Sequence, residues 1–303
     1  MHLINKLGIS YNRKVIFSTD DNPVYYIFMP IVARSWIKMG YHPICIVVGN
    51  YNTWMDNSQR KLVIENTLDA GGDIYFLELN RLHRNIRMKR YLPSAISQVS
   101  RLRSACLNCN SDDYCLTSDI DMIPCNKEWF SQQDMTKKIH LFYANGYNHN
   151  RYAMCYIGMK KSTWAEVLKL PSDLYLAITK IMINLGQADK QTQWNYDEIF
   201  ITKNIKSTPG YPDMCQMIDR KIYPNPYYDG SFCGIPAELP EGRIDRSNWV
   251  FNGDISLVID AHCKRPIWKD WYELCVLLSH IFSDTEMKLV NNYFELFMRE
   301  NIV

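Results

Sequence analysis

The chain has 303 residues, 47% of them hydrophobic, and is long enough to bury one large core. Lys and Arg total 34 against 32 Asp and Glu, and the net charge of +2 argues against a dedicated nucleic-acid or membrane-surface binder. Ten cysteines without a recognisable signal peptide or N-x-S/T sequon indicate a reducing, cytoplasmic location. The apolar stretches are shorter than the ~20 residues of a spanning helix, so no membrane span is expected.

Strand and helix patterns alternate along residues 1–150. Short apolar runs without strict alternation are typical of strands buried on both faces of a parallel sheet. Asn22-Pro23 and Gly40 have the properties of a helix start and a helix end. In chain order we expect strands at 14–19, 44–48, 74–79, 114–118 and 139–143, and helices at 23–40, 60–68 and 93–105. This order predicts an α/β fold with a Rossmann-like half whose sheet is mixed but mostly parallel.

Residues 151–303 follow an α+β pattern instead. We expect strands at 153–157 and 255–260, and helices at 162–168, 173–185, 197–203, 271–282 and 284–299. Segment 209–249 is rich in Pro, Gly and Tyr and is predicted to form a long ordered loop or lid. Because no repeat, low-complexity tract or linker separates the halves, we expect a single domain over 1–303, divided near residue 150.

Two carboxylates, Asp119 and Asp121, directly follow the expected strand at 114–118. A spacing of two places both on one side of an extended chain. Ligands bind at the carboxyl ends of strands in open α/β sheets, and carboxylate oxygens suit Mg²⁺ or Mn²⁺. The pair is therefore predicted to hold a metal that bridges a diphosphate. The alternative is that Asp119 caps a turn and Asp121 faces solvent.

A second polar group follows the expected strand at 255–260 and consists of His262, Lys264 and Arg265. An imidazole would complete the ligand set and favour Mn²⁺ over Mg²⁺. Lys264 or Arg265 would hold phosphate oxygens as charge develops on a leaving group. A structural histidine is the alternative interpretation.

Together these features resemble the metal-dependent GT-A glycosyltransferases. The resemblance depends, in chain order, on strand 14–19 followed by Asp20-Asp21, on Asp119/Asp121 after a fourth strand, and on His262-x-Lys264-x-Pro266-x-Trp268. The sequence is most similar to small stand-alone enzymes such as those of large DNA viruses. It is more distantly similar to glycogenin-like transferases, whose His-x-x-Gly-x-x-Lys-Pro-Trp motif is longer.

The resemblance implies transfer of a sugar from a nucleoside-diphosphate sugar, most commonly a UDP-sugar, to a hydroxyl acceptor such as a glycan. It implies Mn²⁺ or Mg²⁺ as cofactor, a donor site in the first half and an acceptor site in the second. The implied metal ligands are Asp119, Asp121 and His262, with Asp121 bound directly. The implied donor contacts are Ser18, Thr19, Asp20, Asp21, Gln98, Arg101, Asp119 and Lys264. On the acceptor side or in the lid it places Asn145, Gly158, Arg246 and Trp249.

An inverting transferase also needs a carboxylate that takes the proton of the acceptor hydroxyl. Asp197, and after it Glu198, are the candidates, since both stand at the start of an expected helix where negative charge is favoured. Asp197 as a helix cap is the alternative. In retaining relatives the same region binds donor hydroxyls, so the stereochemistry stays open.

The same residues bear on three other classes of protein. A sugar nucleotidyltransferase is disfavoured because residues 17–22 contain no glycine-rich loop for a triphosphate. A haloacid-dehalogenase-type phosphatase with Asp119 as nucleophile is the alternative enzyme, although Ile123 stands where its motif usually has Thr or Val. A non-catalytic carbohydrate-binding relative also stays open, and the oligomeric state is not indicated.

Overall fold

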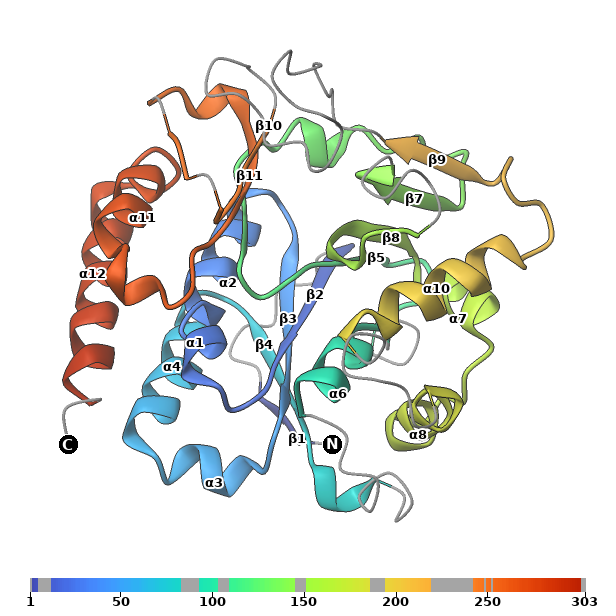
Figure 1. Ribbon diagram of the computed structural model, residues 1–303, viewed down its shortest axis with the longest axis horizontal. Helices are drawn as coiled ribbons and strands as arrows, with labels where there is room; N and C mark the ends of the chain where they lie inside the picture. Colours follow the sequence, from blue (N-terminus) through green and yellow to red (C-terminus); the bar gives the residue numbers. More distant parts are fainter. Residues whose placement is uncertain are drawn as a thin grey trace.

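The computed structural model describes residues 2–4, 12–82, 93–102, 109–144, 151–185, 194–218, 242–247, 249–251 and 253–300. Within these residues an eight-stranded sheet has the order β1-β4-β3-β2-β5-β8-β7-β9 (Figure 1). The strands are β1 (His2–Ile4), β2 (Arg13–Thr19), β3 (His42–Val48), β4 (Asp73–Leu77), β5 (Tyr114–Thr117), β7 (Ile139–Phe142), β8 (Ile157–Lys160) and β9 (Cys215–Ile218). Strands β4, β3, β2 and β5 are parallel neighbours, whereas β1 and β8 run antiparallel to theirs. The expected α/β fold with a mixed, mostly parallel sheet is confirmed.

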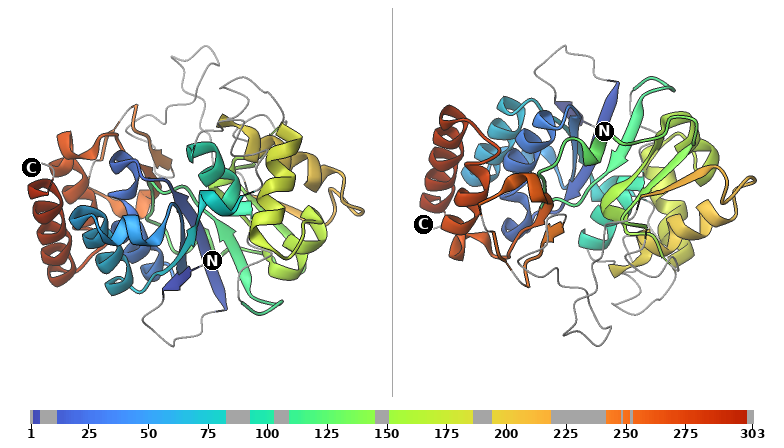
Figure 2. Two further views of the ribbon diagram at one scale, coloured as in Figure 1. Left: turned by 90° about the horizontal axis from the view of Figure 1, so that it is seen from below. Right: turned by 90° about the horizontal axis from the view of Figure 1, so that it is seen from above.

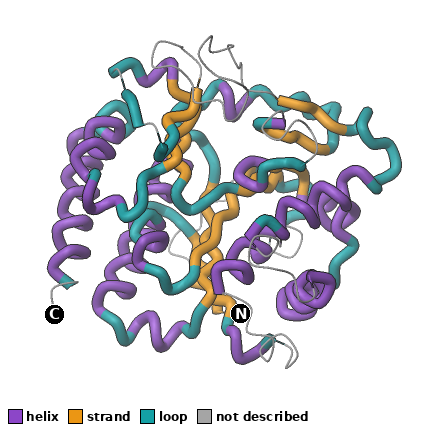
Figure 3. The backbone as a smooth tube through the Cα atoms, viewed as in Figure 1, coloured by secondary structure: helices purple, strands orange, loops and turns teal. Residues whose placement is uncertain are grey.

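Helices pack on both faces of this sheet, as Figures 1 and 3 show. The helices are α1 (Pro23–Tyr26), α2 (Met29–Lys38), α3 (Tyr51–Met55), α4 (Ser58–Asp69), α6 (Pro93–Ser100), α7 (Lys161–Leu168), α8 (Leu174–Leu185), α10 (Tyr196–Lys206), α11 (Trp271–Leu278) and α12 (Asp284–Arg299). Along β2, Val15 and Phe17 join the core under α2, α4 and α12, while Ile16 joins the core under α6, α8 and α10. Burial on both faces explains why the strand sequences are continuously apolar.

A second, three-stranded sheet brings distant parts of the chain beside the main one. It consists of β10 (Gly242–Ile244), β11 (Val258–His262) and β6 (Met122–Pro124), in that order. Strand β11 runs antiparallel to β6 with His262 opposite Met122, and parallel to β10 with Ala261 opposite Ile244. Because β6 starts directly after Asp121, this register places the end of β11 at the Asp119/Asp121 segment.

Several element boundaries differ from the sequence prediction. The helix expected at 23–40 is two helices, α1 and α2, because Pro30 has no N–H to continue the hydrogen-bond ladder. Residues 153–157 are mainly a 3₁₀ turn at Met154–Tyr156 before β8, and residues 255–260 begin as a 3₁₀ turn at Ile255–Leu257 before β11. The predicted lid contains β9 and β10, and its residues 219–241 lie outside the described residues.

The C-terminal helix packs back onto the first helices of the chain (Figure 2). Tyr293 Oη donates to the Ile27 carbonyl at 2.8 Å, and Gln59 Nε2 donates to the Phe297 carbonyl at 3.1 Å. Ser283 and Glu286 form a capping box that starts α12. In the described part of the chain, no helix is both long and apolar enough to cross a membrane.

Candidate active site

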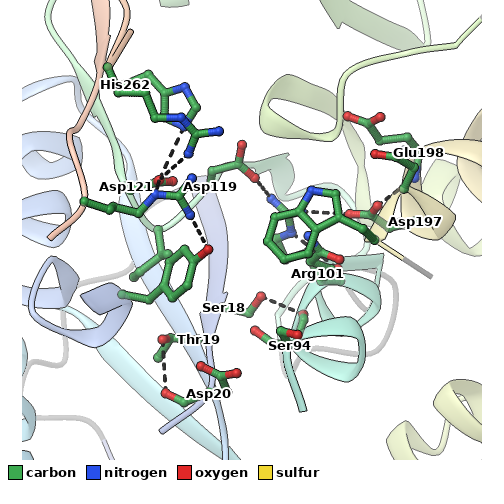
Figure 4. A pocket seen from close by; sticks show the side chains of 18 residues that line it. Ser18, Thr19, Asp20, Ser94, Arg101, Asp119, Asp121, Asp197, Glu198 and His262 are labelled. Carbon is green, nitrogen blue, oxygen red and sulfur yellow. Dashed lines mark hydrogen bonds and ion pairs between the residues drawn. The ribbon is translucent and has the colours of Figure 1, made fainter. Parts of the chain in front are cut away.

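A cleft opens where the chain order of the sheet reverses, between β2 and β5. From β2 the sheet continues through β3 and β4 on one side and through β5 on the other, so the direction of the chain across the sheet switches between β2 and β5. Ligands of open α/β sheets bind outside the carboxyl ends of the strands at such a switch point. The carboxyl ends of β2 and β5 lie in this cleft together with α6, the start of α10 and the end of β11 (Figure 4). The predicted residues that line it are Ser18, Thr19, Asp20, Gln98, Arg101, Asp119, Asp121, Asp197, Glu198, Arg246 and His262.

The β2 side of the cleft is held by short hydrogen bonds. Ser18 Oγ donates to the Ser97 carbonyl of α6 at 2.6 Å, which fixes the strand end against the helix. Asp20 accepts the Asn22 N–H at 3.2 Å and is 8% exposed. Burial raises the pKa of Asp20, with the Asn22 hydrogen bond opposing the shift. A buried carboxyl at a strand end is suited to ribose hydroxyls or a base N–H.

Arg101 connects the β5 end of the cleft with α10. Its Nη1 donates to the Ser118 carbonyl at 3.0 Å and to Asp119 Oδ1, while its Nη2 contacts Asp197 Oδ2 at 2.7 Å. The guanidinium is buried, and its two carboxylate neighbours offset the cost of burial and raise its pKa. Arg101 was expected as a donor contact, and the structure adds that it already neutralises Asp119 and Asp197.

Asp121 and His262 meet across β6 and β11. His262 Nε2 lies 3.3 Å from Asp121 Oδ2, and His262 Nδ1 lies 3.2 Å from Asp245 Oδ2. Burial would lower the pKa of His262, but Asp121 and Asp245 together raise it to about 10. Burial likewise opposes the ionised form of Asp121, yet the cationic groups of His262 and Arg265 hold the pKa of this carboxyl below its usual value.

Two further arginines face Asp121 from the same wall. Arg265 Nε lies 3.2 Å from Asp121 Oδ2, and its guanidinium lies 4.7 Å from the centre of the Tyr25 ring while donating to Tyr25 Oη. Arg246 Nη1 lies 4.0 Å from the same Asp121 oxygen. The cleft therefore combines carboxylates with a cluster of cations, an arrangement suited to a metal and an anionic ligand together.

Glu198 occupies the far end of the cleft from His262. Its Oε2 contacts Arg151 Nε at 2.8 Å, and its Oε1 accepts the Met154 N–H at 3.4 Å. Burial raises the pKa of Glu198 to about 8, with Asp197 adding to the shift and Arg151 opposing it. The neighbouring Asp197 is 2% exposed and accepts the Glu198 N–H at 2.9 Å. Burial raises the pKa of Asp197 as well, against the attraction of Arg101.

The arrangement of Asp121 and His262 fits a cation whose remaining coordination positions are filled by a bound ligand. Among the described residues, no three His, Cys, Asp or Glu side chains converge as a preformed metal site. Asp121 Oδ2 is nevertheless buried and accepts no well-aligned hydrogen bond in the described structure. Its 3.3 Å separation from His262 Nε2 is close to the ~3 Å between adjacent ligands on a cation with bonds of about 2.1 Å. Asp119, held by Arg101, fits the direct coordination shell less well.

Four predicted residues are not brought to the cleft. Lys264 Nζ contacts Asp270 at 3.0 Å and Glu273 at 2.6 Å, on the side of α11. Asp21 is 60% exposed and lies 3.4 Å from Arg60. Trp249 packs against the core instead of lining the cleft.

Gly158, expected on the acceptor side, is the fourth. It faces the Tyr114 ring within the sheet, where an added Cβ would lie 1.8 Å from the Tyr114 hydroxyl. The close approach that this glycine permits is therefore core packing. Asn145 lies outside the described residues.

The structure also adds residues that the motifs did not indicate. Ser94, Trp194 and Asn195 line the cleft, as does Tyr25. Asp245 contacts His262 because it directly follows β10, and β10 lies within the segment that the sequence predicts to be a loop. The only signal in the sequence was the Asp-x-Ser turn at 245–247.

No protein-family model matches this chain, and no curated protein sequence matches it. Its structure is similar to the glycosyltransferase GlyE of Streptococcus pneumoniae TIGR4, with 12% identity and a TM-score of 0.42, covering 69% of this chain and 45% of GlyE. The galactosyltransferase LgtC, solved with donor and acceptor sugar analogs, has 16% identity and a TM-score of 0.35, covering 61% of this chain and 70% of LgtC. The bifunctional glycosyltransferase WbbM has 11% identity and a TM-score of 0.37, covering 95% of this chain and 52% of WbbM. All three are glycosyltransferases, but likeness at this level carries no argument about the activity of this chain.

Proposed function

We propose that this protein is a glycosyltransferase that moves a sugar from a nucleoside-diphosphate sugar, with UDP-sugars as first choice, to a hydroxyl acceptor such as a glycan, assisted by Mn²⁺ or Mg²⁺. The observation that carries the proposal is the meeting of Asp121 Oδ2 and His262 Nε2 at 3.3 Å in the switch-point cleft. A carboxylate and an imidazole with cations beside them suit a diphosphate that reaches the site with a divalent metal. The cleft lies at the carboxyl ends of β2 and β5, where open α/β sheets bind nucleotides, and this position supports a nucleotide ligand.

Each part of the donor has residues suited to it. Asp20 and the end of β2 offer acceptors for the ribose or the base, and Tyr25 lines the cleft with them. Asp121 and His262 would hold the metal, which supplies positive charge against the diphosphate as it becomes the leaving group. Arg265 and Arg246 are placed to bind phosphate oxygens and stabilise the charge that develops there. Arg265 takes this role in place of Lys264.

The two carboxyls at the start of α10 differ in how well they suit the base of an inverting enzyme. Asp197 is held by Arg101 at 2.7 Å, and a carboxylate paired with a guanidinium accepts a proton less readily than an unpaired one. Burial raises the pKa of Glu198 to about 8, toward the range that suits a general base. Glu198 is therefore the better candidate for the base of an inverting reaction, while contact of this region with donor-sugar hydroxyls would accompany a retaining one.

The first test is metal-dependent turnover of the donor. Wild-type protein with Mn²⁺ is expected to release UDP from a UDP-sugar, slowly to water and faster to a suitable acceptor. Asp121→Asn should lower this rate about 100-fold, the order of loss found when one charge-stabilising group is removed. Asp112→Asn, which alters an 82% exposed carboxylate paired with Lys160, is the control and should keep the wild-type rate.

The same assay separates the alternatives. In one alternative outcome, wild-type protein releases phosphate from simple phosphomonoesters and no sugar from the donor. If Asp119→Asn abolished this release, the protein would be assigned as a phosphatase instead of a transferase. Donor binding without turnover against any acceptor would favour a carbohydrate-binding relative. Full activity in Asp121→Asn would show that the central assignment is wrong.

A further inference from the structure

We propose that Asp245 is a positioning residue that orients the His262 imidazole so that Nε2 is presented to a metal at Asp121. The inference rests on the metal-dependent function proposed above. It concerns a residue that would not contact the metal or the donor in this arrangement, and that acts only through His262.

The strand register brings the three side chains together. Ile244 pairs with Ala261 in the parallel β10–β11 ladder, so the next residues, Asp245 and His262, are neighbours. His262 itself pairs with Met122 in the antiparallel ladder, and the Cys263 N–H donates to the Asp121 carbonyl at 2.9 Å. Backbone pairing on both sides of β11 therefore fixes His262 between two carboxylates.

The ring contacts one carboxylate with each nitrogen. Nδ1 lies 3.2 Å from Asp245 Oδ2 and Nε2 lies 3.3 Å from Asp121 Oδ2. The side chain of His262 is 18% exposed and that of Asp121 is 6% exposed, so the Nε2 end is the buried end of the pair. Asp245 is 33% exposed and lies on the outer side.

The Asp245 carboxylate is itself held in place. Its Oδ1 accepts the Ser247 N–H at 3.0 Å and the Ser247 hydroxyl at 2.7 Å, which leaves Oδ2 for the histidine. A metal that binds at Nε2 would displace the proton from that nitrogen, so the remaining ring proton would lie on Nδ1. An ionised carboxylate only accepts hydrogen bonds, so Asp245 Oδ2 would accept this proton and hold the ring with Nε2 facing the metal beside Asp121.

Asparagine at position 245 would change this without changing the shape of the turn. If its oxygen keeps the two Ser247 hydrogen bonds, its NH₂ group faces Nδ1 and favours the opposite tautomer, with the proton on Nε2. Asp254 offers a matched control, because its Oδ1 accepts the Ser256 N–H at 3.0 Å and the Ser256 hydroxyl at 2.6 Å in the same Asp-x-Ser turn.

The test is a titration with Mn²⁺ alone and with Mn²⁺ plus UDP, in which free Mn²⁺ is followed by its paramagnetic resonance signal. Asp245→Asn is expected to weaken Mn²⁺ binding about 10- to 100-fold, the usual effect of removing the partner of a ligating histidine. Asp254→Asn should stay within about twofold of wild type. Melting curves of each variant establish that it is folded, and Asp245→Ser provides a second variant without the carboxylate.

A double-mutant cycle with His262→Ala separates positioning from a general structural role. If Asp245 acts through the histidine, Asp245→Asn adds nothing in the His262→Ala background, whereas a structural effect would persist. Wild-type affinity in Asp245→Asn, with His262→Ala weakened, would overturn the inference and leave the proposed function standing. No Mn²⁺ binding by wild type, even with UDP, would overturn both.

Discussion

Two adjacent carboxyls at the start of α10 lie in one cleft but in different surroundings. Asp197 is bound by a buried guanidinium. Glu198 instead pairs with the half-buried Arg151, and burial favours its protonated form. Sequence position alone made both residues candidates for the same role. Their surroundings depend on α6 and on residues near 151–154, which are distant in the chain, so the difference appears only in the folded structure.

We expect Glu198→Gln to change how stability depends on pH. The folded pKa of about 8 lies above the ordinary glutamate value of 4.5, so between these values the folded state holds a proton that the unfolded state has lost. The contribution of this group is therefore complete below about pH 4.5 and is lost as pH rises toward about 8, at up to about 1.4 kcal/mol per pH unit. The glutamine variant lacks this loss, so its stability relative to wild type should rise between pH 5 and pH 8.

Urea unfolding at pH 5, 6.5 and 8 measures this difference. Glu166→Gln, which alters a 52% exposed carboxylate beside Lys138, is the control and should follow the wild-type pH dependence. Parallel curves for Glu198→Gln and wild type over this range would contradict the shifted pKa.

At the scale of elements, the turn that follows β11 decides which cation faces the cleft. The sequence places Lys264 and Arg265 side by side, and either fits a phosphate contact. In the structure Lys264 turns to Asp270 and Glu273 at the start of α11, while Arg265 turns to Asp121 and Tyr25. The acidic residues that attract Lys264 belong to a different element, so the motif could not distinguish the two.

We expect Arg265→Met and Lys264→Met to differ in donor binding although both remove one positive charge. Calorimetric titration with UDP in the presence of Mn²⁺ should show about 10- to 100-fold weaker binding for Arg265→Met, as for the loss of a charged hydrogen bond of about 1.5–3 kcal/mol. Lys264→Met should keep UDP affinity within about threefold and lower stability by at most about 1 kcal/mol, because its ion pairs are partly exposed and screened by solvent. The reverse order would show that the wrong cation has been assigned to the phosphate.

Strands β2, β3, β4, β5 and β7 of the main sheet were predictable because their chemistry is local, whereas β1, β8 and β9 were not predicted at their positions. Runs such as 14–19 and 44–48 are apolar on both faces, and the Asp119/Asp121 pair follows such a run directly. The small sheet was not predictable, since β6 and β10 have three residues each and exist through pairing with β11. The site followed the same division: the pair at the end of β5 could be identified from the sequence, whereas Asp245, Arg265 and Tyr25 needed the tertiary structure.

At the scale of the whole molecule, the cleft is built from residues near both ends of the chain. Asp20 follows β2, His262 ends β11 and Arg265 comes after it, and α12 packs onto α1 and α4 to hold the two regions together. The C-terminal helices therefore support one wall of the cleft from behind. A ligand that contacts both walls should stabilise the folded chain as a unit.

We expect Mn²⁺ and UDP together to raise the melting temperature by more than the sum of their separate effects. Among the described residues, Asp121 and His262 would supply two metal ligands, so we expect the diphosphate to complete the coordination and each ligand to strengthen binding of the other. At 100 times its Kd a ligand adds about 2.7 kcal/mol of stability, which for a chain of this size is a rise of about 4 °C. Thermal unfolding with Mn²⁺, with UDP and with both measures the three shifts, and Asp121→Asn should lose the excess while Asp112→Asn keeps it. Simply additive shifts would mean that metal and nucleotide bind at separate places, and the cleft would then have to be assigned to only one of them.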